Sequence, residues 1–389
     1  MSSKKIGDLP SEVLFYFFTK FPVQILPECM LVCKQWYNLI HHPFFVDLHH
    51  SQINHHSDDR NSFLVFCHTI RKTNHSQLYL VDKKVIDTTS LEAILIRSKK
   101  EIKMELPSAK KIIIVGSSNG LLCLSLLPEH DSFYICNPIT REILEIPQFF
   151  GIQIDRFDQY NTSSGFAFDS TTDMYKIVYL WCYHDNSQRR GTRIVMYTLG
   201  SAKEWKWLED VPEMLCNGSE QFFLNGSLHF HMVDSSENYT SIGAIDITTE
   251  KFKKLTEPPL DDKVRSRSLR LLRDCLCLSD DIFSGPFHLW IMEEYGVMGS
   301  WKKVYSIKKK TLGHAVKGGF NVRTMNKKGA VLVQGSKGQG YYDLDQQEFK
   351  DIKVEGIPSK ASDMDVVVHV GSLISPISIE VAPYLRIDV

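Results

Sequence analysis

The chain has 389 residues, of which 43% are hydrophobic and 23% charged, and its formal net charge at pH 7 is −1. This composition is ordinary for a folded globular protein and excludes a wholly disordered chain. The near-zero net charge excludes a globally basic nucleic-acid-binding protein, and no run of about 18 apolar residues is present to span a membrane. The polar start, MSSKKIGDLP, and nine cysteines without a CxxC pair predict a reduced protein of the cytosol or nucleus.

The N-terminal segment has the apolar spacing of helices. One stripe is formed by residues spaced three and four apart, namely Val13, Leu14, Phe17, Phe18 and Phe21. Pro22 is expected to end this helix, because proline lacks the N–H that the helix needs. A second helix is predicted to begin near Pro27 and to carry Trp36 and Ile40 on its apolar face. The sequence His41-His42-Pro43 is expected to stop it.

From residue 62 onward the pattern changes to short strand-like runs such as KIIIV, YKIVYLW and FHLWIM, each bounded by turn-forming residues. Turn positions recur at a spacing of about 50 residues, at Asn137, Leu199, Asp246, Tyr295 and Asp343. A strand-only repeat of this length predicts a β-propeller with about six four-stranded blades. The last run, DVVVHV, is expected to pair with the strands of residues 62 to 82 and close the ring. A large β-sandwich with accidental spacing is the alternative.

Together these patterns predict a helical domain over residues 5–48, a polar linker over 49–61 and a propeller-like domain over 62–380. Histidines concentrate before and within this linker, at His41, His42, His49, His50, His55 and His56. A solvated linker is favoured over a metal site, because no ligand motif of defined spacing is present. We expect neither a metal nor a cofactor.

A nucleophile-like motif occurs in Gly116-Ser117-Ser118-Asn119-Gly120, which fits Gly-x-Ser-x-Gly. A nucleophile elbow needs a strand before it and a helix after it, but here both flanks read as strands. We therefore interpret Asn119-Gly120 as a hairpin turn and expect no enzyme activity. A hydrolase using Ser118 is the alternative from another functional class.

Two sets of motifs resemble known families. The segment LPSEVLFYFFTKFPVQILPECMLVCKQWYNLI resembles the F-box. The pieces GLLCL, NPITR, GFAFDSTTDMYKIV, LNGSLHF, DLDQQEF and HVGSLISP, in this order, resemble the F-box-associated domain of plant F-box proteins. The first resemblance implies docking on the Skp-type linker protein of a ligase that also contains a cullin and a RING subunit. The second implies capture of a target protein for ubiquitination and degradation.

The resemblance and the apolar stripes together give the candidate linker-binding residues. They are Leu9, Pro10, Val13, Leu14, Phe17, Phe18, Phe21, Pro22, Val32, Cys33, Trp36 and Ile40. Large aromatic side chains supply much of the energy of protein interfaces. Some of these residues must instead form the small core of the helical domain, and the sequence does not separate the two sets. A helical cap on a propeller scaffold that never joins a ligase is the alternative.

The target is expected to bind to loops at one end of the propeller. Candidate residues are Trp181, Tyr183, His184, Lys308, Lys309, Lys310, Lys327 and Lys328. The segment from Tyr295 to Tyr342 holds ten Lys or Arg residues and no Asp or Glu. Such a positive field favours an acidic or phosphorylated target, whereas a solvated rim of lysines is the alternative. Nucleic acid is disfavoured because no binding motif is present.

Overall fold

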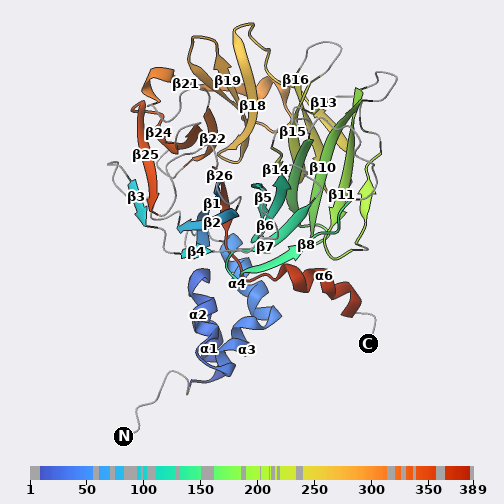
Figure 1. Ribbon diagram of the computed structural model, residues 1–389, viewed down its shortest axis with the longest axis vertical. Helices are drawn as coiled ribbons and strands as arrows, with labels where there is room; N and C mark the ends of the chain where they lie inside the picture. Colours follow the sequence, from blue (N-terminus) through green and yellow to red (C-terminus); the bar gives the residue numbers. More distant parts are fainter. Residues whose placement is uncertain are drawn as a thin grey trace.

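The structure, a computed structural model, describes most of the chain. The described residues are 9–55, 61–70, 75–82, 94–97, 100–102, 111–127, 132–149, 162–184, 190–201, 203–209, 211, 215–216, 220–233, 240–312, 320–325, 330–335, 339–355 and 364–385. In this part of the chain, short helices project from one end of a ring of β-sheets, and helix α6 lies at the same end (Figure 1).

The N-terminal helices follow the predicted pattern with one break. They are α1 (Ser11–Phe18), the 3-10 helix η2 (Val23–Ile25), α2 (Leu26–Met30), α3 (Lys34–His41) and α4 (Pro43–His55). Helix α1 ends before Pro22, as expected. The predicted second helix is divided in two, because Cys33 has an extended backbone (φ −162°, ψ 166°) that separates α2 from α3.

Helix α4 occupies part of the segment that we expected to be a linker. Helix α3 does end at His41, but Pro43 then begins α4, since proline is tolerated in the first turn of a helix. His49 and His50 are buried on α4. His49 Nε2 lies 2.9 Å from the carbonyl oxygen of Phe21, and His50 Nε2 lies 2.6 Å from Asn119 Oδ1. The prediction of a solvated histidine linker is wrong for these two residues.

Six sheets form the blades of a propeller, which confirms the predicted fold. The strands of each blade are given from the innermost outward. Blade 1 contains β26 (Met364–Val370), β1 (Ser62–Ile70), β2 (His75–Asp82) and β4 (Lys100–Ile102). Blade 2 contains β5 (Lys111–Ser118), β6 (Leu121–Leu127), β7 (Phe133–Asn137) and β8 (Glu142–Glu145). Blade 3 contains β9 (Thr162–Asp169), β10 (Met174–His184), β11 (Arg190–Thr198) and β12 (Trp205–Trp207). Blade 4 contains β13 (Leu215–Cys216) and β14 (Phe222–Leu224), which both pair with β15 (Ser227–Val233), then β16 (Thr240–Asp246) and β17 (Phe252–Leu255). Blade 5 contains β18 (Val264–Leu272), β19 (Cys275–Ile282), β20 (Phe287–Met292) and β21 (Trp301–Ile307). Blade 6 contains β22 (Phe320–Met325), β23 (Ala330–Gly335), β24 (Gln339–Asp343) and β25 (Glu348–Glu355).

The ring closes through its last strand. Strand β26 pairs antiparallel with β1, with Phe63 opposite His369, which confirms the predicted closure. An unexpected strand, β3 (Ile94–Arg97), adds to the outer edge of blade 6 in parallel, with Ile94 opposite Ile352. The 3-10 helices η5 (Met298–Ser300) and η6 (Lys309–Thr311) flank β21.

The sequence repeat has a physical basis in side-chain-capped turns. Asn137, Asp246 and Asp343 each end a third strand of a blade, and each accepts backbone N–H groups from the turn that follows. The N···O distance is 2.8 Å to Ile139, to Thr249 and to Gln346, respectively.

The predicted hairpin turn at Asn119-Gly120 is confirmed. Both residues have positive φ, at 43° and 88°, which is the conformation that this residue pair favours in a tight turn.

The helices and the propeller share one hydrophobic core. Its buried members include Val23 and Leu26 from the helices and Phe63, Ile139 and Leu373 from the ring. A hydrogen bond of 2.8 Å from the Val23 N–H to Asn61 Oδ1 adds a polar contact across the junction. The helical domain is therefore packed against the propeller.

Helix α6 (Pro376–Leu385) was not expected from the sequence. It is held by the buried Glu380, whose carboxylate accepts hydrogen bonds of 2.8 Å from Tyr197 Oη and from the Gly200 N–H. The last helix that the structure describes is thereby attached to blade 3.

Candidate functional site

Helix α1 has an inner and an outer apolar face. Phe18 is fully buried and packs edge-on against Trp36, with 4.8 Å between the ring centroids. Phe17, one residue earlier, is 47% exposed and packs against Phe21 at 4.7 Å. Adjacent residues of a helix point in different directions, so a single aromatic run supplies both the core and an outer surface.

The structure separates the two sets of candidate linker-binding residues that the sequence left mixed. Those on the surface are Leu9, Pro10, Val13, Phe17, Val32 and Cys33. Three are fully buried and form the core of the helical domain, namely Leu14, Phe18 and Ile40. The remaining three are half-buried at the boundary, namely Phe21, Pro22 and Trp36.

The same helices expose apolar residues that the sequence analysis missed. They are Tyr16, Leu31, Tyr37 and Phe44. Leu31 lies in the turn between α2 and α3, and Phe44 lies in the first turn of α4, 5.8 Å from the ring of Phe15. Large apolar residues within the F-box-like segment were the available signal, but Tyr16, Leu31 and Phe44 do not fall on the two predicted stripes. We call the exposed apolar residues of α1–α4 the helical apolar surface.

Of the residues predicted to bind a target, Trp181 is in the interior. It packs between blades against Phe149, Tyr179 and Trp207, with ring centroids 5.5 to 5.8 Å apart. It is therefore not on the loop surface where we expected a target to bind. Tyr183 and His184 end strand β10, but their side chains lie outside the described residues, and so do Lys327 and Lys328.

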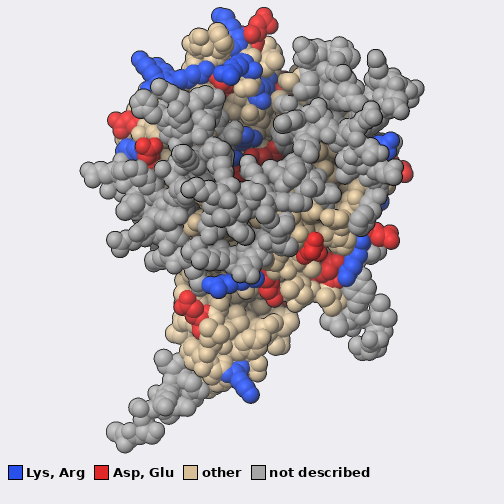
Figure 2. All heavy atoms as spheres, viewed as in Figure 1, with Lys and Arg blue, Asp and Glu red and all other residues tan. Residues whose placement is uncertain are grey.

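The basic stretch is partly neutralised where the structure describes it. Lys308 and Lys310 are exposed, but Lys309 forms an ion pair with Asp281 and lies 4.8 Å from the ring centroid of Phe287. Basic side chains gather at the end of the molecule that carries β18, β19 and β21 (Figure 2). Arg323, however, points into the ring and contributes nothing to this outer surface.

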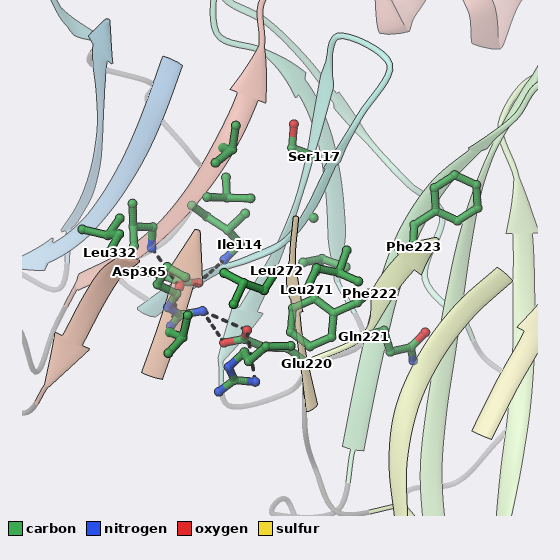
Figure 3. A pocket seen from close by; sticks show the side chains of 18 of the residues that line it. Ile114, Ser117, Glu220, Gln221, Phe222, Phe223, Leu271, Leu272, Leu332 and Asp365 are labelled. Atoms are coloured by element: carbon green, nitrogen blue, oxygen red, sulfur yellow. Dashed lines mark hydrogen bonds and ion pairs between the residues drawn. The ribbon is translucent and has the colours of Figure 1, made fainter. Parts of the chain in front are cut away.

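A cavity of about 780 Å³ lies on the axis of the ring. The innermost strand of every blade contributes to its wall, and the close-up shows acidic and basic side chains converging at its centre (Figure 3). Figure 2 shows acidic and basic atoms side by side near the centre of the face in view. The apolar part of the wall includes Leu64, Ile114, Phe166, Phe222, Leu271 and Leu272.

Four charged residues form a network in this cavity. Arg323 Nη1 donates to both carboxylate oxygens of Glu220, at 2.7 and 2.8 Å. Its Nη2 lies 3.2 Å from Asp365 Oδ1, and Asp365 Oδ2 accepts a hydrogen bond of 3.1 Å from the Ile114 N–H. Arg270 Nη1 lies 3.9 Å from Glu220. These side chains come from four different blades, so the network also links the blades across the axis.

The surroundings set the charges of the two carboxyl groups differently. Burial opposes the ionisation of Glu220, but the charges of Arg323 and Arg270 outweigh it and hold the pKa of Glu220 well below its usual range. Burial raises the pKa of Asp365. The positive charge of Arg323 offsets only part of this rise, and the negative charge of Glu220 adds to the rise. Glu220 is therefore the more firmly ionised of the two.

The serine motif beside the cavity has a structural role. Ser118 Oγ accepts a hydrogen bond of 2.9 Å from the Phe168 N–H. The histidine nearby pairs with Ser117 instead, with His369 Nδ1 3.0 Å from Ser117 Oγ. Burial lowers the pKa of His369 to about 3, which makes its imidazole a weak base. In the described part of the chain His369 Nε2 has no hydrogen-bond partner, so no carboxylate orients the ring as a triad requires.

Two further features are absent from the described residues. No group of three or more His, Cys, Asp and Glu side chains there is arranged to hold a metal ion. No helix there is long and apolar enough to cross a membrane.

Comparison with known families assigns both parts of the chain. Residues 6–48 match the F-box-like family, and residues 68–376 match the family described as the F-box associated beta propeller domain. The second match alone covers more than half of the chain.

Similar proteins cover nearly the full length. The Arabidopsis thaliana protein named F-box protein At3g07870 is 25% identical over 95% of this chain and 92% of its own length. The Arabidopsis thaliana F-box protein At5g49610 is 27% identical over 83% of this chain and 85% of its own length. Among solved structures, the six-bladed β-propeller of the Aleuria aurantia lectin aligns with a TM-score of 0.40 and 12% identity, over 77% of this chain and 97% of the lectin.

Proposed function

Because the chain belongs to the F-box proteins that carry an F-box associated β-propeller domain, we propose that it is the substrate-recognition subunit of a Skp–cullin–F-box ubiquitin ligase. In this proposal the N-terminal helices bind the Skp-type linker, and the propeller binds a target protein. The chain adds no bond chemistry of its own. It raises the effective concentration of the target near the catalytic subunits.

The helical apolar surface is the observation that carries the proposal. Its exposed members include Val13, Tyr16 and Phe17 on α1 and Leu31 and Val32 in the turn between α2 and α3. Other residues of the same helices are packed in the core that they share with the propeller. Large apolar side chains exposed on one small domain are typical of an interaction surface, and aromatic residues are frequent among the energetic centres of interfaces.

The shared core between the helices and the ring supports a receptor role in a second way. Val23, Phe63 and Leu373 fix the helices on the propeller, so a linker bound to the helices would hold the target at a defined position. The same contact makes deletion of the helices a poor test, because deletion would also expose apolar residues of the ring. Point variants on the outer face avoid this difficulty.

The test is complex formation between the purified chain and a plant Skp-type linker, measured by size-exclusion chromatography. Phe17→Asp is expected to weaken the complex by about 30-fold or more, because it places a charge in a surface that must lose water on binding. Phe283→Asp is the matched control, since Phe283 is an exposed phenylalanine outside the helices, in the turn between β19 and β20 of blade 5. Phe18→Asp is not a docking test, because Phe18 is fully buried.

The outcome that contradicts the proposal is a folded wild-type chain that forms no complex with the linker. In that case the helices serve as a cap that completes the core of the ring, and the chain is an interaction scaffold outside the ligase. Equal binding by Phe17→Asp and the wild type would reject the helical apolar surface as the linker site.

A further inference from the structure

In the axial cavity, the carboxylate side chains are more exposed to a ligand than the arginine side chains are. The side chain of Glu220 is 39% exposed and that of Asp365 is 22% exposed. The side chains of Arg323 and Arg270 are only 13% and 9% exposed. The arginines therefore lie behind the acids, although the four formal charges sum to zero.

The hydrogen bonds of Arg323 lead to the same conclusion. Its Nε donates to Gln334 Oε1 at 2.9 Å, its Nη1 serves both oxygens of Glu220, and its Nη2 faces Asp365. Few donors of Arg323 therefore remain for an incoming anion. A carboxylate has about four acceptor positions. Glu220 therefore retains acceptor capacity toward the cavity after its contacts with Arg323.

The walls of the cavity suit an aliphatic stem. Apolar groups from several blades surround the charged centre, including Phe166, Phe222, Leu271, Leu272 and Val322. Arg270 lies over the ring of Phe222, 5.6 Å from its centroid, so cationic and aromatic groups are already in contact in this wall. The volume of about 780 Å³ lies within the usual range for ligand pockets and exceeds the needs of one bare ion.

We propose that the axial cavity receives a lysine or arginine side chain of the target protein, with the aliphatic stem against the apolar wall and the cationic head at Glu220. That the side chain belongs to a target protein rests on the proposed function above, whereas the site itself does not. A free aliphatic amine shares this chemistry, so the test includes one.

The first experiment measures binding of small probes to the full-length wild-type chain by isothermal titration calorimetry or ligand-observed NMR. The probes are the Nα-acetyl amides of lysine, arginine, norleucine and glutamate, and spermidine. Norleucine has the stem of lysine without the charge. We expect the lysine and arginine probes to bind at least about tenfold more tightly than norleucine, as a charged hydrogen bond in a partly buried site provides.

The second experiment places the probe in the cavity. Glu220→Gln keeps the shape of the side chain and removes its charge, and it is expected to abolish the preference for the cationic probes. Glu348→Gln is the matched control, because Glu348 is an exposed glutamate on the outer strand β25. If Glu220→Gln fails to fold, a crystal of the wild-type chain soaked with the arginine probe decides the question by the position of the guanidinium.

Several results would overturn the inference. They are equal binding of the norleucine probe, preferential binding of the glutamate probe, an unchanged preference in Glu220→Gln, and a soaked guanidinium located away from Glu220. Binding of spermidine without binding of the amino-acid probes would assign the cavity to a free amine and reject the target side chain.

The linker-binding test on the same preparation separates this inference from the proposed function. A chain that binds the linker but not the probes retains the ligase role and loses the cavity site. A chain that binds the probes but not the linker retains the cavity site and loses the ligase role.

Discussion

At the scale of single residues, buried histidines make the fold sensitive to mild acid. Burial lowers the pKa of His369 to about 3, and it lowers that of His229 to about 4. A histidine of the unfolded chain titrates near 6.5. Between these values the unfolded chain binds protons that the folded chain does not bind, so the free energy of unfolding falls as the pH falls. The expected loss from pH 7 to pH 5 is about 2 kcal/mol for each such histidine.

Urea unfolding of the wild type and of His369→Gln at pH 7 and pH 5 measures this effect. The variant is expected to lose about 2 kcal/mol less than the wild type between the two pH values, because it lacks one of the titrating groups. His41→Gln is the control, since His41 is exposed on α3. Equal losses in the wild type and His369→Gln would contradict the assignment.

Single residues also show where the sequence was insufficient. The stripe containing Phe17 and Phe18 was visible, but only packing against Trp36 shows that Phe18 is inside and Phe17 outside. The charge of Arg323 was counted with a basic surface, yet the residue lies on an innermost strand and faces the axis. A local count of charges does not reveal which strand of a blade lines the axial cavity.

At the scale of elements, helix α6 is expected to depend on one buried carboxylate. Glu380→Ala removes the acceptor of the Gly200 N–H and one hydrogen-bond partner of Tyr197 Oη. Because an unsatisfied buried donor is costly, we expect the free energy of unfolding to fall by about 2 kcal/mol. Urea unfolding measures the change, and Glu348→Ala, at an exposed position of β25, should leave the free energy of unfolding nearly unchanged. A small effect of Glu380→Ala would show that α6 is held by its apolar contacts alone.

The elements differ in how well the sequence predicted them. Most strands of the blades were visible, because short apolar runs between turn residues are a local pattern, and Asn137, Asp246 and Asp343 mark the turns directly. Helix α4 was missed because Pro43 was interpreted as a stop. Strand β3 was missed because its partner β25 lies near the other end of the chain, and no local pattern encodes such a pairing.

At the scale of the whole molecule, the ring is closed twice. Strand β26 pairs with β1 at the inner edge of blade 1, and the charged network joins blades 4, 5, 6 and 1 across the axis. Both closures connect residues far apart in the sequence. The sequence could therefore predict the number of blades and the pairing of the last strand from the repeat, but it could not predict the network, whose members belong to no common motif.

The helices and the ring are expected to unfold as one unit, and Gly371 is the position that tests it. A Cβ at this residue would lie 2.8 Å from Phe63 Cε2 in the ring and 2.9 Å from Val23 Cγ1 in the helices. Gly371→Ala is therefore expected to lower the free energy of unfolding by about 1–3 kcal/mol, the usual cost of overpacking. Gly299→Ala is the control, because no atom lies within 4 Å of its added Cβ.

The measurement is urea unfolding followed at once by helical circular dichroism and by tryptophan fluorescence. Coincident transitions that shift together in Gly371→Ala are the expected result, since a shared core links the loss of either part to the loss of the other. A separate early transition of the helices would contradict this coupling. It would also mean that a linker bound to the helices does not fix the position of the propeller.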